Sequence, residues 1–493
     1  MNPEEDGRPA PAFDLDALEV ELKGDTPKPK KPNGDGQHLD AELAPLPSAF
    51  SDDALAVEWV KLHGDDWRYV PDLDRWLEWD GSGWQRVIGN KYFELARILT
   101  REALAWPHAQ DLTKTDRRRI NSATMASAML RWLKSDPRIE LTSEHLDRDP
   151  LLLGVPGGVL DLKHCKLIAA ERSQFTTKRA AVAPDHAPPK RWLEFLAQVT
   201  QGDTDLSDYL QRFAGYCMTG MTNEHALAFL YGTGANGKTT FAETLLGILG
   251  QYAITTGMET LSESHTERHT TEIARFMGAR LIASEETASG SKWNEGRIKR
   301  LTGGGRIAAR FMRCDDIEFE MQGKFLIAGN HKPALRADEA MKRRIHLVPF
   351  LVTIPEADRD RDLMAKLRAE WPQILNWMLQ GCAAWQDYGL APGERIREAT
   401  DKYLKNNDIL GAWMDDRTEA DDARTLNDGR ILHADFCQWC DEQGEKPWSR
   451  RAWSDAMLTA GLQDGRTKHV RGFYGVKLRV SASPTQQPDY YNK

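Results

Sequence analysis

The sequence has little of what marks a secreted or membrane-embedded protein. It has no apolar run near the roughly 18 residues that cross a bilayer. Its first ten residues, MNPEEDGRPA, are acidic and polar and do not resemble a secretory signal. Its six cysteines lie mostly far apart and give no disulfide framework. These absences favour a protein of a reducing cytoplasm that has no membrane partner.

The chain also lacks an excess of positive charge, since its formal net charge is −9. This balance excludes a protein coated in basic residues, but phosphate contacts need only a local basic patch. Its 41% hydrophobic and 28% charged residues are those of an ordinary globular protein, and 493 residues are too many for one core.

Composition and periodicity divide the chain into six segments. Residues 1–48 hold 8 of the 24 prolines, with 11 acidic and 5 basic residues, so we expect a disordered tail. A mainly helical α+β domain is expected over 49–200. Alternating apolar runs and helices predict an α/β domain over 201–355. A helical extension (356–404), helices closed by a basic hairpin as in a winged helix (405–480) and a flexible tail (481–493) follow.

A glycine-rich loop between a strand and a helix is the strongest local signal. Residues 226–231 (ALAFLY) read as a buried parallel strand, GTGANGKT follows, and 240–249 read as a helix. The glycines let backbone N–H groups face phosphate oxygens, Lys238 can reach the β- and γ-phosphates, and the Thr239 hydroxyl can bind Mg²⁺. We therefore expect ATP and Mg²⁺ as ligands. The predicted nucleotide-binding residues are Gly232, Thr233, Gly234, Ala235, Asn236, Gly237, Lys238, Thr239 and Thr240.

Polar and basic residues follow the next apolar runs. Glu285 and Glu286 come directly after the strand candidate 280–284; one can hold Mg²⁺ and the other can orient the attacking water, unless the pair only begins a solvated loop. Asn330 ends the run 324–329 and is placed to bond the γ-phosphate. Arg343 or Arg344, in a basic triplet, is a candidate arginine finger for a neighbouring subunit; such triplets are otherwise surface features.

Basic residues concentrate between the acidic pair and Asn330. Residues 292–313 hold seven basic residues and one acidic residue, a local net charge of +6. The segments 307–310 and 317–321 read as the arms of a hairpin after a flexible turn at 301–305. Such a hairpin can follow phosphates in a ring channel without reading bases. The alternative is a solvated basic loop.

The order of these motifs resembles the superfamily 3 helicases, specifically the phage and plasmid primase–helicase family related to poxvirus primase–helicases. The residues that carry it are GTGANGKTT, LIASEE, IKRLTGGGRIAARF, FLIAGNHKP and MKRRIHLVPF. The resemblance implies an AAA+ core, hexameric rings and 3′-to-5′ movement on single-stranded DNA during replication of a mobile element in a bacterial host. By motif, it places Lys299, Arg310 and Arg313 in the DNA-contacting region and Glu285 at the metal.

The sequence departs from that family in two ways. Gly305 stands where the family usually has an aspartate, and only about 50 low-complexity residues precede the globular part. We therefore expect no primer synthesis by this chain, and a separate primase or host replication proteins are expected partners.

The basic C-terminal hairpin is a candidate for binding origin duplex. His433, Cys437 and Cys440 share one helical face but lack a fourth zinc ligand, so buried cysteines are favoured over a metal site.

Two other functions fit parts of this pattern. One is an origin-binding initiator scaffold in which nucleotide only controls ring assembly and unwinding is secondary. The other is a small-molecule kinase with the same phosphate loop, against which the finger candidate and the basic hairpin count. An ATP-dependent, ring-forming DNA helicase is the function that uses all of the motifs.

Overall fold

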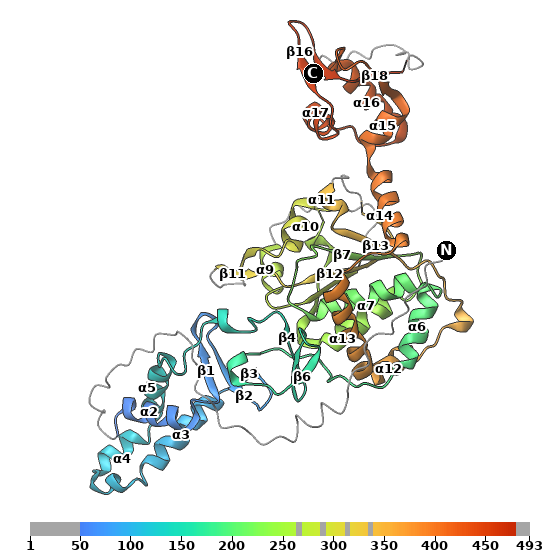
Figure 1. The fold of residues 1–493 in the computed structure, drawn as a ribbon. Coiled ribbons are helices and arrows are strands. Elements are labelled where there is room, and N and C mark those ends of the chain that lie inside the picture. Colours follow the sequence, from blue (N-terminus) through green and yellow to red (C-terminus); the bar gives the residue numbers. More distant parts are fainter. Residues whose placement is uncertain (1–49, 263–268, 286–291, 311–315, 334–338, 480–493) are drawn as a thin grey trace, which may run out of the picture.

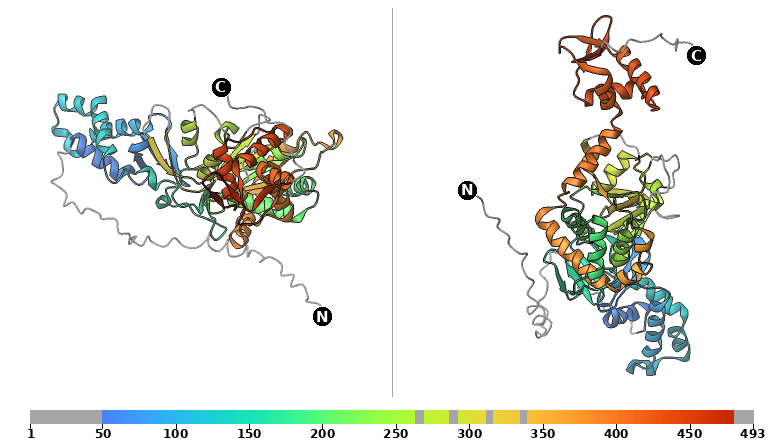
Figure 2. Two further views of the ribbon diagram at one scale, coloured as in Figure 1. Left: turned by 90° about the horizontal axis from the view of Figure 1, so that it is seen from above. Right: turned by 90° about the vertical axis from the view of Figure 1, so that its right-hand side faces the viewer.

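The chain forms a central body with one smaller module at each end (Figure 1). This computed structural model describes residues 50–262, 269–285, 292–310, 316–333 and 339–479. The tails expected at 1–48 and 481–493, together with Glu286 and Arg313, lie outside the described residues. Figure 2 shows the N-terminal and C-terminal modules at opposite ends of the long axis. Within the described ranges, no helix combines the length and apolarity needed to cross a membrane.

The N-terminal module packs helices against a small antiparallel sheet. The sheet has the order β1–β2–β3, and a turn that contains Gly-Ser-Gly joins β2 to β3. The elements are α2 (Asp52–His63), β1 (Trp67–Val70), β2 (Arg75–Trp79), β3 (Trp84–Arg86), α3 (Lys91–Ala103), α4 (Lys114–Ile120) and α5 (Ala123–Lys134). Four tryptophans are buried and therefore serve the core instead of stacking on bases: Trp59, Trp67, Trp76 and Trp84. Trp79 is half-buried.

The central body is built on a five-stranded parallel sheet with the order β13–β7–β12–β9–β8. Alternate residues face two separate cores: Ala228 and Leu230 of β7 lie in one, and Leu227 and Phe229 in the other. Because both faces are covered, the strands are nearly continuous apolar runs. The strands are β7 (Leu227–Tyr231), β8 (Ala253–Thr255), β9 (Leu281–Glu285), β12 (Lys324–Gly329) and β13 (Ile345–Pro349). The expected α/β class is confirmed.

Helices cover both faces of this sheet. The first core holds α6 (Lys190–Thr200), α7 (Thr204–Met218), α8 (Lys238–Leu249), α12 (Leu363–Ala369) and α13 (Trp371–Tyr388). The second holds α9 (His269–Ala274), α10 (Glu295–Thr302), α11 (Glu339–Lys342) and α14 (Glu394–Asn407). A three-stranded antiparallel sheet, β4 (Leu152–Val155), β5 (Gly158–Asp161) and β6 (Lys166–Ile168), adds Leu153 and Leu160 to the first core.

Helices α7 and α13 cross at two glycines. A Cβ atom on Gly381 would lie 2.1 Å from the Gln211 carbonyl oxygen, and one on Gly215 would lie 2.1 Å from the Cys382 backbone nitrogen. Only residues without a side chain allow this approach.

Gly381→Ala is therefore expected to lower the free energy of unfolding by about 2 to 3 kcal/mol, as overpacking does. Urea denaturation measures the change. Gly296→Ala is the matched control, because the nearest atom to its Cβ would be 3.8 Å away. Equal stabilities for the Gly381 variant and the wild type would contradict this account of the crossing.

Two buried cations lie at the amino edge of the sheet. Arg280 donates to the Met218 and Leu152 carbonyl oxygens (both 2.6 Å) and lies over the Tyr252 ring. Lys324 donates to the carbonyl oxygens of Thr219 and Gln322. Both cations thus satisfy carbonyls at the end of α7, where the helix dipole is negative. Burial lowers the pKa of Lys324 from 10.5 to about 7.

The titration of Lys324 predicts a pH-dependent stability. The unfolded chain binds this proton more tightly than the folded chain, so the folded state gains stability as the pH rises from about 7 towards 10. Relative to Lys324→Met, the wild type should gain about 2 kcal/mol between pH 7 and pH 9. Denaturation of both proteins at each pH measures this difference. A constant difference would show that Lys324 does not titrate in this range.

The C-terminal module has its own core around Trp413, Phe436 and Trp453. Its elements are α15 (Ile409–Arg417), β14 (Thr418–Ala420), β15 (Leu426–Asp428), α16 (Gly429–Gln443), α17 (Arg450–Thr459), β16 (Asp464–Arg466), β17 (Arg471–Tyr474) and β18 (Val476–Leu478). Cys440 is buried in that core, and the His433 Nε2 donates to the Trp448 carbonyl oxygen at 3.0 Å. Among the residues that the structure describes, no three metal-ligating side chains come together.

Candidate active site

The glycine-rich loop lies at the carboxyl edge of the central sheet, between β7 and α8. Gly234 (φ 102°) and Gly237 (φ 85°) adopt backbone conformations that disfavour other residues. The loop and the end of β12 surround a cavity of about 360 Å³. Its lining residues are Gly234, Ala235, Asn236, Gly237, Lys238, Thr239, Thr240, Ala328, Gly329 and Asn330. Ligands of open α/β sheets bind at this edge.

Lys238 joins the loop to the end of β12. Its Nζ donates to the Gly232 carbonyl oxygen and to the Asn236 Oδ1 (both 2.9 Å), and to the Asn330 Oδ1 at 3.0 Å. The lysine is 6% exposed, whereas Asn330 is exposed. The structure thus brings together two predicted site residues that lie 92 positions apart in the sequence.

Helix α6 packs against the phosphate loop at Gly237. A Cβ atom on Gly237 would lie 2.6 Å from the Val199 Cγ1 and 2.8 Å from the Phe195 Cε2. The glycine at this position therefore serves close packing on α6 as well as the positive φ. In sequence, only the P-loop pattern marked this glycine, and nothing marked Phe195 or Val199.

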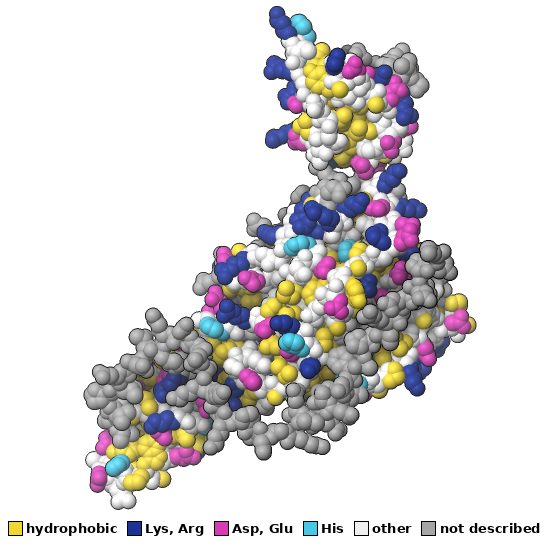
Figure 3. All heavy atoms as spheres, in the orientation of Figure 1, with side chains coloured by type: hydrophobic (Ala, Val, Ile, Leu, Met, Phe, Trp, Pro, Cys, Tyr) yellow, Lys and Arg dark blue, Asp and Glu magenta, His cyan; other side chains and the backbone are white. Residues whose placement is uncertain are grey.

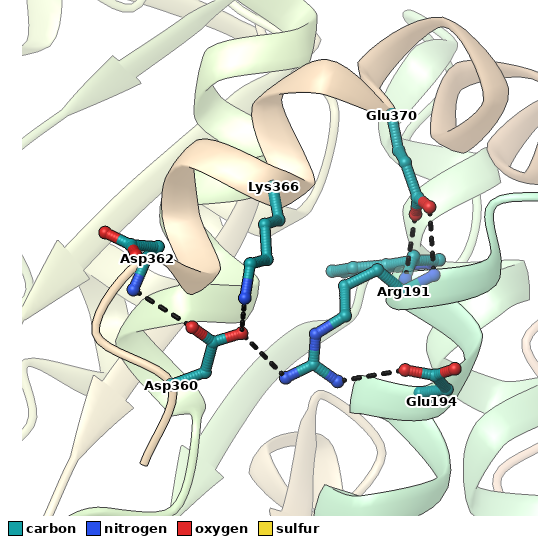
Figure 4. Close-up of polar contacts among 7 residues, drawn as sticks. Arg191, Glu194, Asp360, Asp362, Lys366 and Glu370 are labelled. Carbon is teal, nitrogen blue, oxygen red and sulfur yellow. Dashed lines mark hydrogen bonds and ion pairs between the residues drawn. The ribbon is translucent and has the colours of Figure 1, made fainter.

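A polar cluster joins the first turn of α6 to α12 and to the residues that flank α12 (Figure 4). The Glu370 carboxylate accepts bonds from the backbone N–H groups of Arg191 (2.9 Å) and Trp192 (3.0 Å), which lie in the first turn of α6. The Arg191 guanidinium contacts Asp360 at 3.4 Å. Lys366 donates to the same carboxylate at 2.7 Å, and this bond lowers the pKa of Asp360. Sequence reasoning missed this cluster, since no local motif links positions about 170 apart.

The acidic strand end lies at the same edge as the loop. Ala328 of β12 pairs with Glu285 of β9, and Gly329 pairs with Tyr231 of β7. The carboxyl ends of these three strands are therefore level. The backbone of Glu285 therefore lies at the edge that carries the phosphate loop, and Glu286 follows outside the described residues.

The basic triplet lies at the opposite edge, directly before β13. The exposed Arg343 and the half-buried Arg344 differ in environment. The Arg344 Nη1 donates to the Ala340 carbonyl oxygen at 2.8 Å, within its own segment. Strand β13 runs parallel to β7, and Phe350 at its carboxyl end lies beside the loop. The six residues from Arg344 to Phe350 therefore separate these arginines from the loop by roughly 20 Å at 3.3 Å per residue.

The hairpin expected in the basic region is confirmed. Strand β10 (Arg306–Arg310) pairs with β11 (Asp316–Glu320), while Leu301 and Thr302 belong to α10 and not to the turn. Arg306 and Arg310 lie directly opposite Glu320 and Asp316. Directly paired residues share one face of a hairpin, so Glu320 lies on the same face as Arg306. Lys299 of α10 is half-buried, and Arg313 lies outside the described residues.

Gly305 begins this hairpin in open space. A Cβ atom built on it meets no atom within 4 Å. Packing therefore does not require glycine where the family usually has aspartate.

Comparisons with known proteins agree with the motifs. Residues 56–201 match the family described as D5 N terminal like, and residues 230–344 match a family of unknown function (DUF5906). "Putative helicase L207/L206" of Acanthamoeba polyphaga mimivirus is 25% identical over 390 residues, 69% of this chain and 40% of that protein. "Putative helicase 022R" of Frog virus 3 (isolate Goorha) is 28% identical over 274 residues, 50% of this chain and 28% of that protein.

The chain spans less than half the length of these curated relatives. Among solved structures, the apo C-terminal region of NrS-1 aligns with a TM-score of 0.46 at 8% identity, over 84% of this chain and 96% of that one, a likeness too low to inform function. The D5-type match and the two viral relatives confirm the predicted resemblance: this chain is similar to the superfamily 3 primase–helicases of phages and viruses.

Proposed function

We propose that this chain is an ATP-dependent DNA helicase with an AAA+ core, which acts as a ring on single-stranded DNA. The observation that carries the proposal is the contact of Lys238 with Asn330 over the cavity at the sheet edge. This pairing puts a cation and an amide at one place, where they can bind the γ-phosphate and respond to its loss.

The residues around the cavity fit a nucleotide with Mg²⁺. The positive-φ glycines leave the loop backbone open to phosphate, and α8 begins at Lys238 with its positive dipole end towards the cavity. Thr239 and Glu285 would hold Mg²⁺, which neutralises phosphate charge when bound. The protein's own contribution is to fix Lys238, to aim the loop N–H groups and, through Glu286, to orient the attacking water.

A ring accounts for the position of the basic triplet. Arg343 lies roughly 20 Å from the loop of its own chain, too far for its side chain to reach that cavity. In a head-to-tail assembly one copy can supply this arginine to the cavity of the next. Six copies are proposed from the family resemblance. Particle mass with ATP and single-stranded DNA tests that number.

The proposal is tested by unwinding of a forked duplex. ATP should drive strand separation in the 3′-to-5′ direction, and single-stranded DNA should stimulate phosphate release. A homogeneous, folded protein that hydrolyses no ATP with or without DNA would sink the proposal.

The C-terminal module favours a second role, as an origin-binding initiator. We propose that it is a winged helix whose β16–β17 hairpin contacts duplex phosphates. Arg466, Lys468 and Arg471 are exposed there, and Figure 3 shows Lys and Arg side chains along this edge of the module. Arg471 pairs with Asp464 at 3.8 Å, and Arg466 lies directly opposite Arg471 in the strand register, so two cations lie side by side in this hairpin.

Two substitutions, one in the C-terminal hairpin and one in the acidic pair, distinguish the helicase role from the initiator role. Lys468→Glu should weaken duplex binding severalfold and leave DNA-stimulated ATP hydrolysis intact if the hairpin serves only origin binding. If nucleotide serves only assembly, Glu286→Gln should still support replication, which would favour the initiator over the helicase.

A further inference from the structure

The side chain of Asn236 is buried within the phosphate loop and has a partner at each end. Its Nδ2 donates to the Phe350 carbonyl oxygen at 2.9 Å, and its Oδ1 accepts from the Lys238 Nζ at 2.9 Å. Only 2% of the residue is exposed. An amide that is both donor and acceptor at a buried position fixes the orientation of both partners.

The first loop glycine makes room for this amide. A Cβ atom on Gly232 would lie 2.0 Å from the Phe350 carbonyl oxygen and 2.3 Å from the Asn236 Nδ2. The φ angle of Gly232 is not positive, so its backbone conformation does not require glycine. The close approach of Phe350 and Asn236 is what excludes a side chain at this position. The loop is thus shaped around the bond between Asn236 and Phe350.

Phe350 directly follows strand β13, and the backbone of residues 350–354 bonds to the end of β7 and to the phosphate loop. Its backbone N–H donates to the Tyr231 carbonyl oxygen at 2.8 Å, which extends the pairing of β13 with β7. Four residues later, the Ile354 N–H donates to the Ala235 carbonyl oxygen at 2.9 Å. The segment 350–354 therefore holds the loop through its backbone as well as through Asn236.

The two amides that contact Lys238 differ in their freedom to move. Asn330 is exposed at the cavity, whereas Asn236 is locked by Phe350. An ammonium has three N–H groups. A phosphate that enters the cavity can replace Asn330 as an acceptor, while the Gly232 carbonyl and Asn236 still hold the ammonium in place.

We propose that the Asn236 side chain is a positioning residue that aims Lys238 at the transferred phosphate by anchoring it to the end of β13. This role rests on the proposed ATP hydrolysis. The amide acts through Lys238 and does not itself contact the reacting atoms. Because misplacement of a catalytic group by about 1 Å can cost 100-fold in rate, its loss affects turnover more than binding.

The test compares Asn236→Ala with Gln211→Ala in the full chain. Gln211 also donates a side-chain amide bond to a backbone carbonyl, that of Trp377 at 3.0 Å, but it lies between α7 and α13, away from the loop. For Asn236→Ala, kcat for ATP should fall about 10- to 100-fold while KM changes less than threefold. Gln211→Ala should leave both constants within twofold of the wild type.

Hydrogen–deuterium exchange without nucleotide gives an independent readout. Amides of residues 350–354 should exchange faster in Asn236→Ala than in either other protein, because the loop is released from that segment. Two results for Asn236→Ala would overturn the positioning role of Asn236 and leave the proposed function standing. One is amide exchange of residues 350–354 equal to that of the wild type, and the other is a change of kcat and KM by the same factor. A wild type that does not hydrolyse ATP would sink the proposed function and, with it, this role.

Discussion

Lys238→Ala is expected to lower ATP turnover about 10²- to 10³-fold, the cost of removing one preorganised group that stabilises transition-state charge. Lys238 is buried and donates to the Gly232 carbonyl oxygen and to the side-chain oxygens of Asn236 and Asn330, so its ammonium is already held at the cavity before phosphate arrives. Phosphate release at saturating ATP measures the effect.

Lys324→Met is the matched control for the loss of a buried lysine from the same sheet. Lys324 lies at the amino end of β12, whereas Asn330 follows the carboxyl end, so this variant should keep the wild-type kcat below its unfolding temperature. Equal losses in the two variants would indicate general damage to the sheet. Full activity in a folded Lys238→Ala protein would place hydrolysis elsewhere.

Arg343→Ala is expected to lower kcat about 10³-fold with little change in nucleotide affinity, as loss of an arginine finger does. Arg344→Ala should lower kcat by less, because its guanidinium is partly buried and bonds to Ala340 in its own chain. The sequence left the choice between the two arginines open. Steady-state kinetics with fluorescent-nucleotide binding measures both quantities, and a larger loss of kcat in Arg344→Ala would reverse the assignment.

Mixing the two inactive variants tests whether the arginine acts on a neighbour. In mixed rings, an Arg343→Ala subunit keeps Lys238 and can receive Arg343 from a Lys238→Ala subunit. About a quarter of the interfaces in an equal random mixture would then be complete, so activity should return. Mixtures that stay inactive after confirmed subunit exchange would show that both residues act within one chain.

The sequence predicted the parts of this site that depend on neighbours along the chain. The strand before Gly232, the helix after it and the polar residue after β12 all follow from apolar runs and local motifs. The strands were recognisable because both sheet faces are buried, which leaves few polar residues within them.

The contacts that complete the site depend on topology, which a single sequence does not reveal. Asn236 meets Phe350 only because β13 lies beside β7, although 114 positions separate the two residues. The bonds from α6 to Glu370 have the same origin. The local charge around the hairpin also depends on topology. The +6 of residues 292–313 omits Asp316, Glu318 and Glu320, which β11 brings opposite β10.

Strand β13 has one end at the basic triplet and the other at Phe350, beside its own phosphate loop. β13 is the edge strand of the sheet and pairs with β7 along all five of its residues. Because its backbone is already extended, it cannot lengthen further, and a displacement of one end moves the other end. In the proposed ring, β13 of one copy would link the phosphate loop of that copy to its own Arg343, which would lie in the cavity of the neighbouring copy. Arrival or loss of phosphate in one cavity would then change the position of the arginine in the next cavity, so neighbouring sites would not react independently.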